Sequence, residues 1–166
     1  MNFSSIKEYF YKLYNFGMMM MLMPLVMFLF IYYLLLSGWV APIIQDESAM
    51  DTLLIAFPTI ALATLTIVHL AGAKKFKFIS TQVGLSKKLD LYFPIVKMKT
   101  RAALSLSLMM AVGLFFTGHE WFSIYFTVIV FWFLLQWPTP RKLCHNLKLK
   151  GDEREMVISK GEAFKI

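Results

Sequence analysis

The chain has 166 residues, of which 58% are hydrophobic, 16% aromatic and only 16% charged, and its mean hydropathy is +0.63. Soluble domains are about half apolar and about a quarter charged, so this composition excludes an ordinary soluble domain and indicates a membrane protein. The net charge is +7, yet no basic run is interleaved with aromatic residues, so we expect no nucleic-acid partner.

Four apolar segments are long enough to cross a bilayer, which takes about 20 helical residues. They lie at 16–37, 52–72, 101–118 and 121–137, and none carries Asp, Glu, Lys or Arg in its middle. The sequence predicts an all-α fold: an integral membrane four-helix bundle with a short N-terminal interfacial helix and short cytoplasmic C-terminal helices. The expected parts are an N-terminal helix (1–15), a first transmembrane pair (16–72) with an external loop (38–51), a basic cytoplasmic loop (73–100), a second transmembrane hairpin (101–137) and a tail (138–166).

The N-terminal segment begins with Ser5 followed by Glu8, a pattern typical of a capping box. Behind it, apolar residues recur at helical spacing: Ile6, Phe10 and Leu13. This predicts a short amphipathic helix that lies on the inner leaflet ahead of the first span.

The segment 16–37 could be an export signal, a metal site or a membrane span. A cleaved signal has an apolar region of about 7–15 residues before a small-residue cleavage site. This run is longer and a poor cleavage site follows it, so we interpret it as the first span. Pro24 predicts a kink, which neighbouring helices can accommodate.

Met19, Met23 and Met27 lie four residues apart on one face of this span. Thioethers are soft ligands for Cu(I), and the spacing resembles the intramembrane methionine pair of copper uptake channels. No His cluster or Met-rich external segment accompanies the three methionines, and Met also fills gaps in packed helices. We favour packing and expect no metal or cofactor, while whether these methionines bind anything stays open.

The charges predict an orientation. The loop 38–51 has a net charge of −3 and the turn at Glu120 has −1, whereas the loop 73–100 with Arg101 has +7 and the tail 138–166 has +3. Basic segments beside spans face the cytoplasm, so both termini should lie inside. We expect a multi-pass protein of a bacterial-type inner (cytoplasmic) membrane, in contact with its anionic inner leaflet.

The second span follows Asp51, the expected N-cap. Pro58 predicts a bend, and with Thr59 and His69 it supplies candidate pore or gating residues. The alternative is that the threonine hydroxyl bonds back to its own helix and that the histidine reaches the inner interface without a further role.

The loop 73–100 mixes lysines with apolar residues. Two interpretations carry equal weight: an interfacial helix that ends at Pro94, and a solvated basic loop.

The third and fourth spans should form a hairpin with a tight turn at 118–120. Ala103, Ser107 and Ala111 lie four apart on one face of the third span. Such a stripe lets helices approach closely, so we expect a helix-packing seam or a seam for a partner. The fourth span is bulky and aromatic, which favours the third as the inner helix.

In the tail, Asp152 with Glu155 predicts a helix start and Gly161 a helix stop. Cys144 is the single cysteine and lies on the expected reducing side, so it indicates no redox function.

The sequence lacks the residues that several membrane activities require. No titratable residue lies in mid-span, as proton-coupled transport would require. His69 and His119 fall at opposite ends of the spans, too far apart to hold one haem. We therefore expect no enzyme.

The preferred hypothesis is a non-catalytic accessory subunit of a multi-subunit inner-membrane complex, with other integral membrane subunits as partners. Transport, secretion and proton-driven motors of the TonB-energising type are the candidate complexes. The alternative is a small homo-oligomeric transporter or channel, and a membrane enzyme acting on lipid or quinone is a third.

Overall fold

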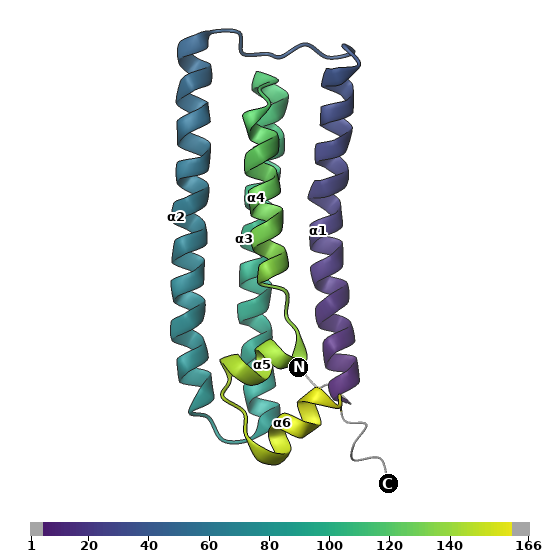
Figure 1. Cartoon of the computed structure of the whole chain (residues 1–166), viewed down its shortest axis with the longest axis vertical. Coiled ribbons are helices and arrows are strands. Elements are labelled where there is room, and N and C mark those ends of the chain that lie inside the picture. Colours follow the sequence, from purple (N-terminus) through teal and green to yellow (C-terminus); the bar gives the residue numbers. More distant parts are fainter. Residues whose placement is uncertain (1–4, 161–166) are drawn as a thin grey trace.

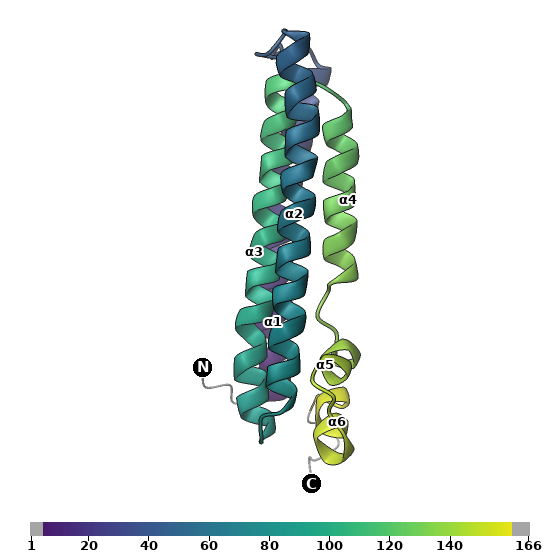
Figure 2. The same ribbon diagram turned by 90° about the vertical axis from the view of Figure 1, so that its left-hand side faces the viewer.

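The computed structural model describes residues 5–160, and all regular secondary structure in that range is helical. The helices are α1 (Ile6–Leu36), α2 (Glu47–Ser80), α3 (Leu85–Thr117), α4 (Trp121–Leu135), α5 (Pro140–Asn146) and α6 (Gly151–Ile158). α1 and α2 flank α3, and α4 packs against α3 from one side (Figures 1 and 2). The short helices α5 and α6 lie beyond α4, at the end of the bundle where α2 joins α3 (Figure 1).

Three helices are long and apolar enough to cross a membrane: α1, α2 and α3. The 34 residues of α2 extend about 51 Å, whereas the bilayer core is only about 30 Å thick. α4 has 15 residues and bends by 76° into α5, and the two make a fourth candidate span only when counted together. The chain is thus helical with three candidate membrane spans, and both the four-span count and the placement in a membrane stay predictions.

The N-terminal segment is not a separate interfacial helix. α1 runs through it and through Pro24 without a break, and Gly17, between the amphipathic turns and the apolar run, is buried against Trp137. The cap is as predicted: the Ser5 hydroxyl accepts a hydrogen bond from the Glu8 backbone N–H at 3.1 Å. Phe10 and Leu13 are buried against other helices of the chain, so the apolar face of this segment packs on protein.

The segment 73–100 is neither a loop nor a separate helix that ends at Pro94. α2 continues to Ser80, α3 begins at Leu85, and only residues 81–84 connect them. Pro94 lies inside α3, where a proline costs a backbone hydrogen bond. The turns around it are buried in the protein, and this packing outweighs the local preference.

Two other helix boundaries differ from the prediction. Asp46, rather than Asp51, caps α2, and its carboxylate accepts the Ala49 N–H at 3.1 Å. α6 starts one residue before Asp152 and has no side-chain cap. The stop predicted at Gly161 lies outside the described residues.

The tight turn between α3 and α4 forms as predicted, with Gly118 in the left-handed conformation at φ 63°. The loop between α1 and α2 folds onto this turn. A Cβ on Gly118 would lie 2.6 Å from Cγ of Pro42. The N–H groups of Ile43 and Ile44 both donate to the Phe116 carbonyl, at 3.0 and 2.9 Å. This end of α3 is therefore tied to the loop that joins its two flanking helices.

Two buried apolar clusters hold the helices together. One lies among α1, α2, α3 and α4, with Met110, Ala111 and Phe122 fully buried at its centre. The second, here called the basic-end cluster, joins the start of α1, the end of α2 and the start of α3 to the chain after α4. Its buried members are Tyr9, Phe10, Leu13, Phe76, Ile79, Leu89, Tyr92, Phe93, Ile95, Val96, Leu143, Cys144, Leu147, Leu149 and Val157.

Candidate functional site

The small-residue stripe of α3 lies in the interior of the chain. Ala103, Ser107 and Ala111 are all buried. Ala103 and Ser107 line a narrow gap among α1, α3 and α4, and Ala111 belongs to the cluster that includes Phe28 and Phe126. The close approach that small residues permit is thus used between helices of the same chain.

The three candidate pore residues of α2 do not come together. Thr59 is exposed, and its hydroxyl donates to the Ile55 carbonyl of its own helix at 2.7 Å. Pro58 lies beside it within the continuous helix. His69 follows ten residues later, which is about 15 Å along the helix axis. Of these three, only His69 lines the polar cavity described next.

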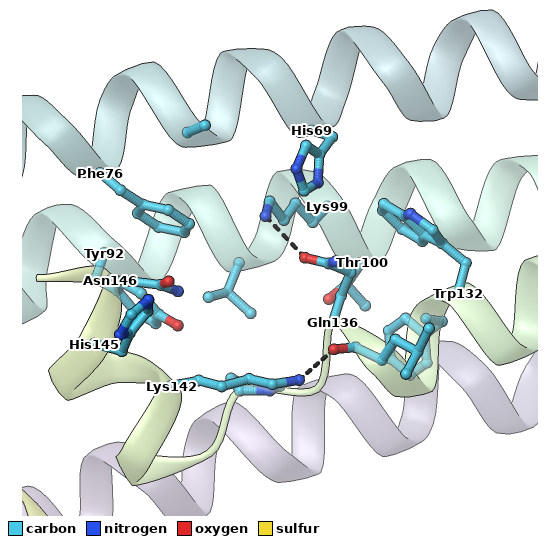
Figure 3. A pocket seen from close by; sticks show the side chains of 15 residues that line it. His69, Phe76, Tyr92, Lys99, Thr100, Trp132, Gln136, Lys142, His145 and Asn146 are labelled. Carbon is cyan, nitrogen blue, oxygen red and sulfur yellow. Dashed lines mark hydrogen bonds between the residues drawn. The ribbon is translucent and has the colours of Figure 1, made fainter.

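A cavity of about 340 Å³ lies beside the basic-end cluster, between α2, α3 and the bent α4–α5 segment (Figure 3). We call it the basic cavity. Among the described residues, no Asp or Glu lines it. Its polar lining comes from α2, α3, α5 and the residue that caps the end of α4, and consists of His69, Tyr92, Lys99, Thr100, Gln136, Lys142, His145 and Asn146.

Lys99 is the buried base of this lining, with only 9% of its surface exposed. Its Nζ donates to Oε1 of Gln136 at 3.0 Å and lies 5.0 Å from the ring centre of Phe76 (Figure 3). Gly72 on α2 makes room for the lysine, since a Cβ there would lie 2.6 Å from Lys99 Cε. A glycine on one helix therefore leaves space for the present course of the lysine side chain from the next.

Lys142 enters the basic cavity from the opposite side, on α5. Thr139 caps this helix by accepting the Lys142 backbone N–H at 3.3 Å, and Pro140 occupies the first helical position. The ammonium group of Lys142 donates to the Leu135 carbonyl at the end of α4 (Figure 3). Helix-terminal carbonyls lack intrahelical partners, so this bond stabilises the bend and holds the lysine at the cavity.

Sequence reasoning found His69 but missed the other polar groups of the cavity. Lys99 was one of many bases in the segment expected to be a loop, and Lys142 was one of many in the tail. A usable signal was Gln136, a polar residue directly after a long aromatic run. What brings these groups together is the bend between α4 and α5, which the sequence pattern does not reveal.

The methionine face of α1 points away from the chain. Met19 is 73% exposed, Met23 61% and Met27 39%, so these side chains do not fill gaps among the helices of this chain. Within residues 5–160, no group of three or more His, Cys, Asp or Glu side chains is arranged to hold a metal ion.

Comparisons with protein-family models, with curated proteins and with solved structures found no match to this chain.

Proposed function

We propose that the chain is a non-catalytic accessory subunit of a multi-subunit inner-membrane complex. Complexes that carry out transport or secretion, or that form a proton-driven motor of the TonB-energising type, are the candidates. In this role the chain supplies helices that pack against other integral membrane subunits, and the chemistry or energy conversion belongs to those subunits.

One observation supports this proposal most directly: two of the three long helices contact the rest of the chain along a single face. In the most apolar stretches of α1 and α2, 17% and 6% of the residues are buried, compared with 50% in α3. Two long apolar surfaces, on opposite sides of α3, are therefore available to neighbouring subunits. The exposed methionines of α1 add to this support, since Met adapts readily to irregular partner surfaces.

The test is extraction of a tagged, full-length chain in a mild detergent, followed by size analysis and mass spectrometry. We expect a particle well above the 19.3 kDa of one chain, with other integral membrane proteins in fixed ratio. A chain that runs only as a lone monomer, without companions, would contradict the proposal.

Enlarging exposed side chains locates the surface that binds the partner. Met19→Trp on α1 and Leu62→Trp on α2 change residues that are each 73% exposed, so the fold of the chain should tolerate both. We expect one of them to reduce co-purification of the partner while the other acts as its control. Equal helicity of both variants by circular dichroism confirms that any loss arises at the interface.

A second candidate function, a homo-oligomeric transporter or channel, is favoured by His69 on the rim of a polar cavity and by exposed Thr59 on the same helix. Solute flux into liposomes that contain only the purified chain would support it. Flux that falls in His69→Ala while the oligomer stays intact would connect transport to this helix.

A further inference from the structure

We propose that the basic cavity is a binding site for a phosphate group, carried either by an anionic lipid of the adjoining leaflet or by a free phosphate. This goes beyond the subunit role and does not depend on it. The cavity is present in the single chain, so phosphate binding can be tested on the purified protein without other subunits.

The charge of the cavity is the first argument. Lys99 and Lys142 both line it, and the positive charge of Lys142 acts on Lys99. No carboxylate from the described residues lines the cavity to offset these charges. Burial of the Lys99 ammonium group is costly without a counter-charge, and the exposed Lys142 adds a second positive charge to the same cavity. The cavity therefore favours an anion.

The hydrogen-bond donors are the second argument. An ammonium group has three N–H donors. Lys99 donates one bond to Gln136, and Lys142 donates one to the Leu135 carbonyl. Further donors remain on both, and Thr100 and Asn146, which carry a hydroxyl and an amide, line the same space. A phosphate group, with several acceptor oxygens and negative charge, matches this set, and charge-assisted bonds of this kind are among the strongest.

The position of the cavity along the bundle is the third argument. His69 and Gln136 lie near the ends of the apolar segments of their helices, where lipid headgroups are expected. Trp132 and Leu135 supply apolar lining next to the polar groups, as a headgroup with its attached chains requires. Basic pockets between membrane helices on the cytoplasmic side bind phosphate-bearing headgroups in this way.

A second basic surface provides a contrast. A wider depression of about 790 Å³ over α5 and α6 is lined by bases that include Arg141, Lys148 and Arg154. All three are exposed, so water and salt screen their charges. The basic cavity differs because Lys99 is held, desolvated, at its inner wall, and we therefore assign the phosphate site to it.

The experiment measures binding to the purified full-length chain in a neutral detergent. The probes are phosphatidylglycerol and phosphatidylcholine, detected by native mass spectrometry, and inorganic phosphate, detected by calorimetry and as a competitor of the lipid. Retention of phosphatidylglycerol over phosphatidylcholine supports a lipid headgroup. Direct binding of inorganic phosphate, with displacement of the lipid, supports free phosphate as the ligand. The proposal would be overturned if the chain showed no preference for phosphatidylglycerol and no binding of inorganic phosphate.

Three variants locate the site. Lys142→Gln and Lys99→Gln each remove one ammonium group from the cavity, and Arg141→Gln removes a neighbouring charge that lies outside it. We expect each lysine variant to bind about tenfold more weakly, and Arg141→Gln to bind as the unmodified chain does. Lys142 is exposed, so its variant keeps the test informative even if Lys99→Gln does not fold.

The result that overturns the assignment is equally definite. Equal weakening in Arg141→Gln and Lys142→Gln would mean that the surface charge of α5 attracts the anion, without a built site. Unchanged affinity in the Lys99→Gln, Lys142→Gln double variant would exclude the cavity directly.

Discussion

Two glycines in the helices place neighbouring side chains in different ways. Gly113 on α3 lies under Phe122, and a Cβ there would come within 2.3 Å of the ring of this fully buried residue. Gly72 on α2 lies against Lys99, and the nearest atom to its Cβ would be Cε of that flexible side chain. The first contact restricts the rigid ring of Phe122, whereas the second restricts the flexible side chain of Lys99, which can move aside.

This contrast gives a matched pair of substitutions. Gly113→Ala should lower stability by about 1–3 kcal/mol, because the buried ring must move and α4 with it. Gly72→Ala should be neutral or slightly stabilising, since alanine favours a helix by about 1 kcal/mol and the lysine can shift. Thermal unfolding in detergent, followed by circular dichroism, measures both. A Gly113→Ala variant as stable as Gly72→Ala would show that the α3–α4 contact is loose.

Cys144 is enclosed by the tail of the chain. Its thiol is buried, with Sγ 3.9 Å from the Arg154 carbonyl on α6. Burial raises the pKa of the Cys144 thiol above its ordinary value, and the charge of Arg154 opposes this only in part. Less thiolate is therefore present at neutral pH than in an exposed cysteine.

The reactivity of Cys144 checks this arrangement. Since the thiolate is the nucleophile, alkylation by N-ethylmaleimide at pH 7.5 should be about tenfold or more slower in the folded chain than in denaturant. The folded-state rate should keep rising with pH beyond the point where the unfolded-state rate levels off. Equal rates in the two states would mean that α6 does not cover the thiol.

Whether a residue's role can be predicted depends here on whether its partners are local. The capping role of Ser5 could be predicted because the bond joins residues three apart. The buried position of Lys99 could not, because its neighbours are Gly72 on another helix and Gln136 at the end of a third. Sequence spacing carries the first kind of information and not the second.

At the scale of elements, α6 is held to α3 by an ion pair. Nζ of Lys88 lies 2.6 Å from Oε2 of Glu153, and Lys88 is largely buried. Val157 on the same short helix is fully buried in the basic-end cluster. With eight residues, α6 is too short to be stable alone in water, so these contacts determine whether it stays docked.

Breaking the ion pair should release α6. Glu153→Gln should weaken its docking by about 1–2 kcal/mol, because the lysine then keeps a buried charge without its charged partner. We expect Cys144 to be alkylated several-fold faster in this variant. Glu155→Gln, which removes the same charge from an exposed position on α6, is the control and should leave the rate unchanged. Equal rates in both variants would contradict a role for the ion pair.

The helices themselves were easier to predict than their ends. The turn at Gly118 could be placed, because the left-handed conformation there favours glycine. The continuity of α3 through Pro94 could not, because local preference argues for a helix end at that point. Burial of neighbouring residues such as Tyr92 and Phe93 reverses that preference, and burial depends on the tertiary structure.

On the scale of the whole molecule, charges of opposite sign gather at opposite ends. Asp46, Glu47 and Glu120 lie where α1 joins α2 and α3 joins α4, and lysines such as Lys77 and Lys87 lie at the other end, where α2 joins α3 (Figure 1). The positive-inside rule predicts that the basic end faces the cytoplasm.

Cysteine accessibility tests the orientation. In a Cys144→Ser background, Gln45→Cys places a thiol in the acidic loop and Val83→Cys places one in the connection between α2 and α3. Both native side chains are exposed. A membrane-impermeant maleimide should label Gln45→Cys in intact cells and Val83→Cys only after permeabilisation. The opposite pattern would reverse the predicted topology.

The central position of α3 also bears on how the chain is made. α1 and α2 each pack mainly on α3, and they are synthesised before it. As predicted spans, both would then enter the bilayer before the α3 surface on which they pack has been synthesised. Until α3 is inserted, each is an apolar helix without its packing partner, open to membrane chaperones and to intramembrane quality control. A translation product that stops short of α3 would stay in that vulnerable state, and the cell should degrade it.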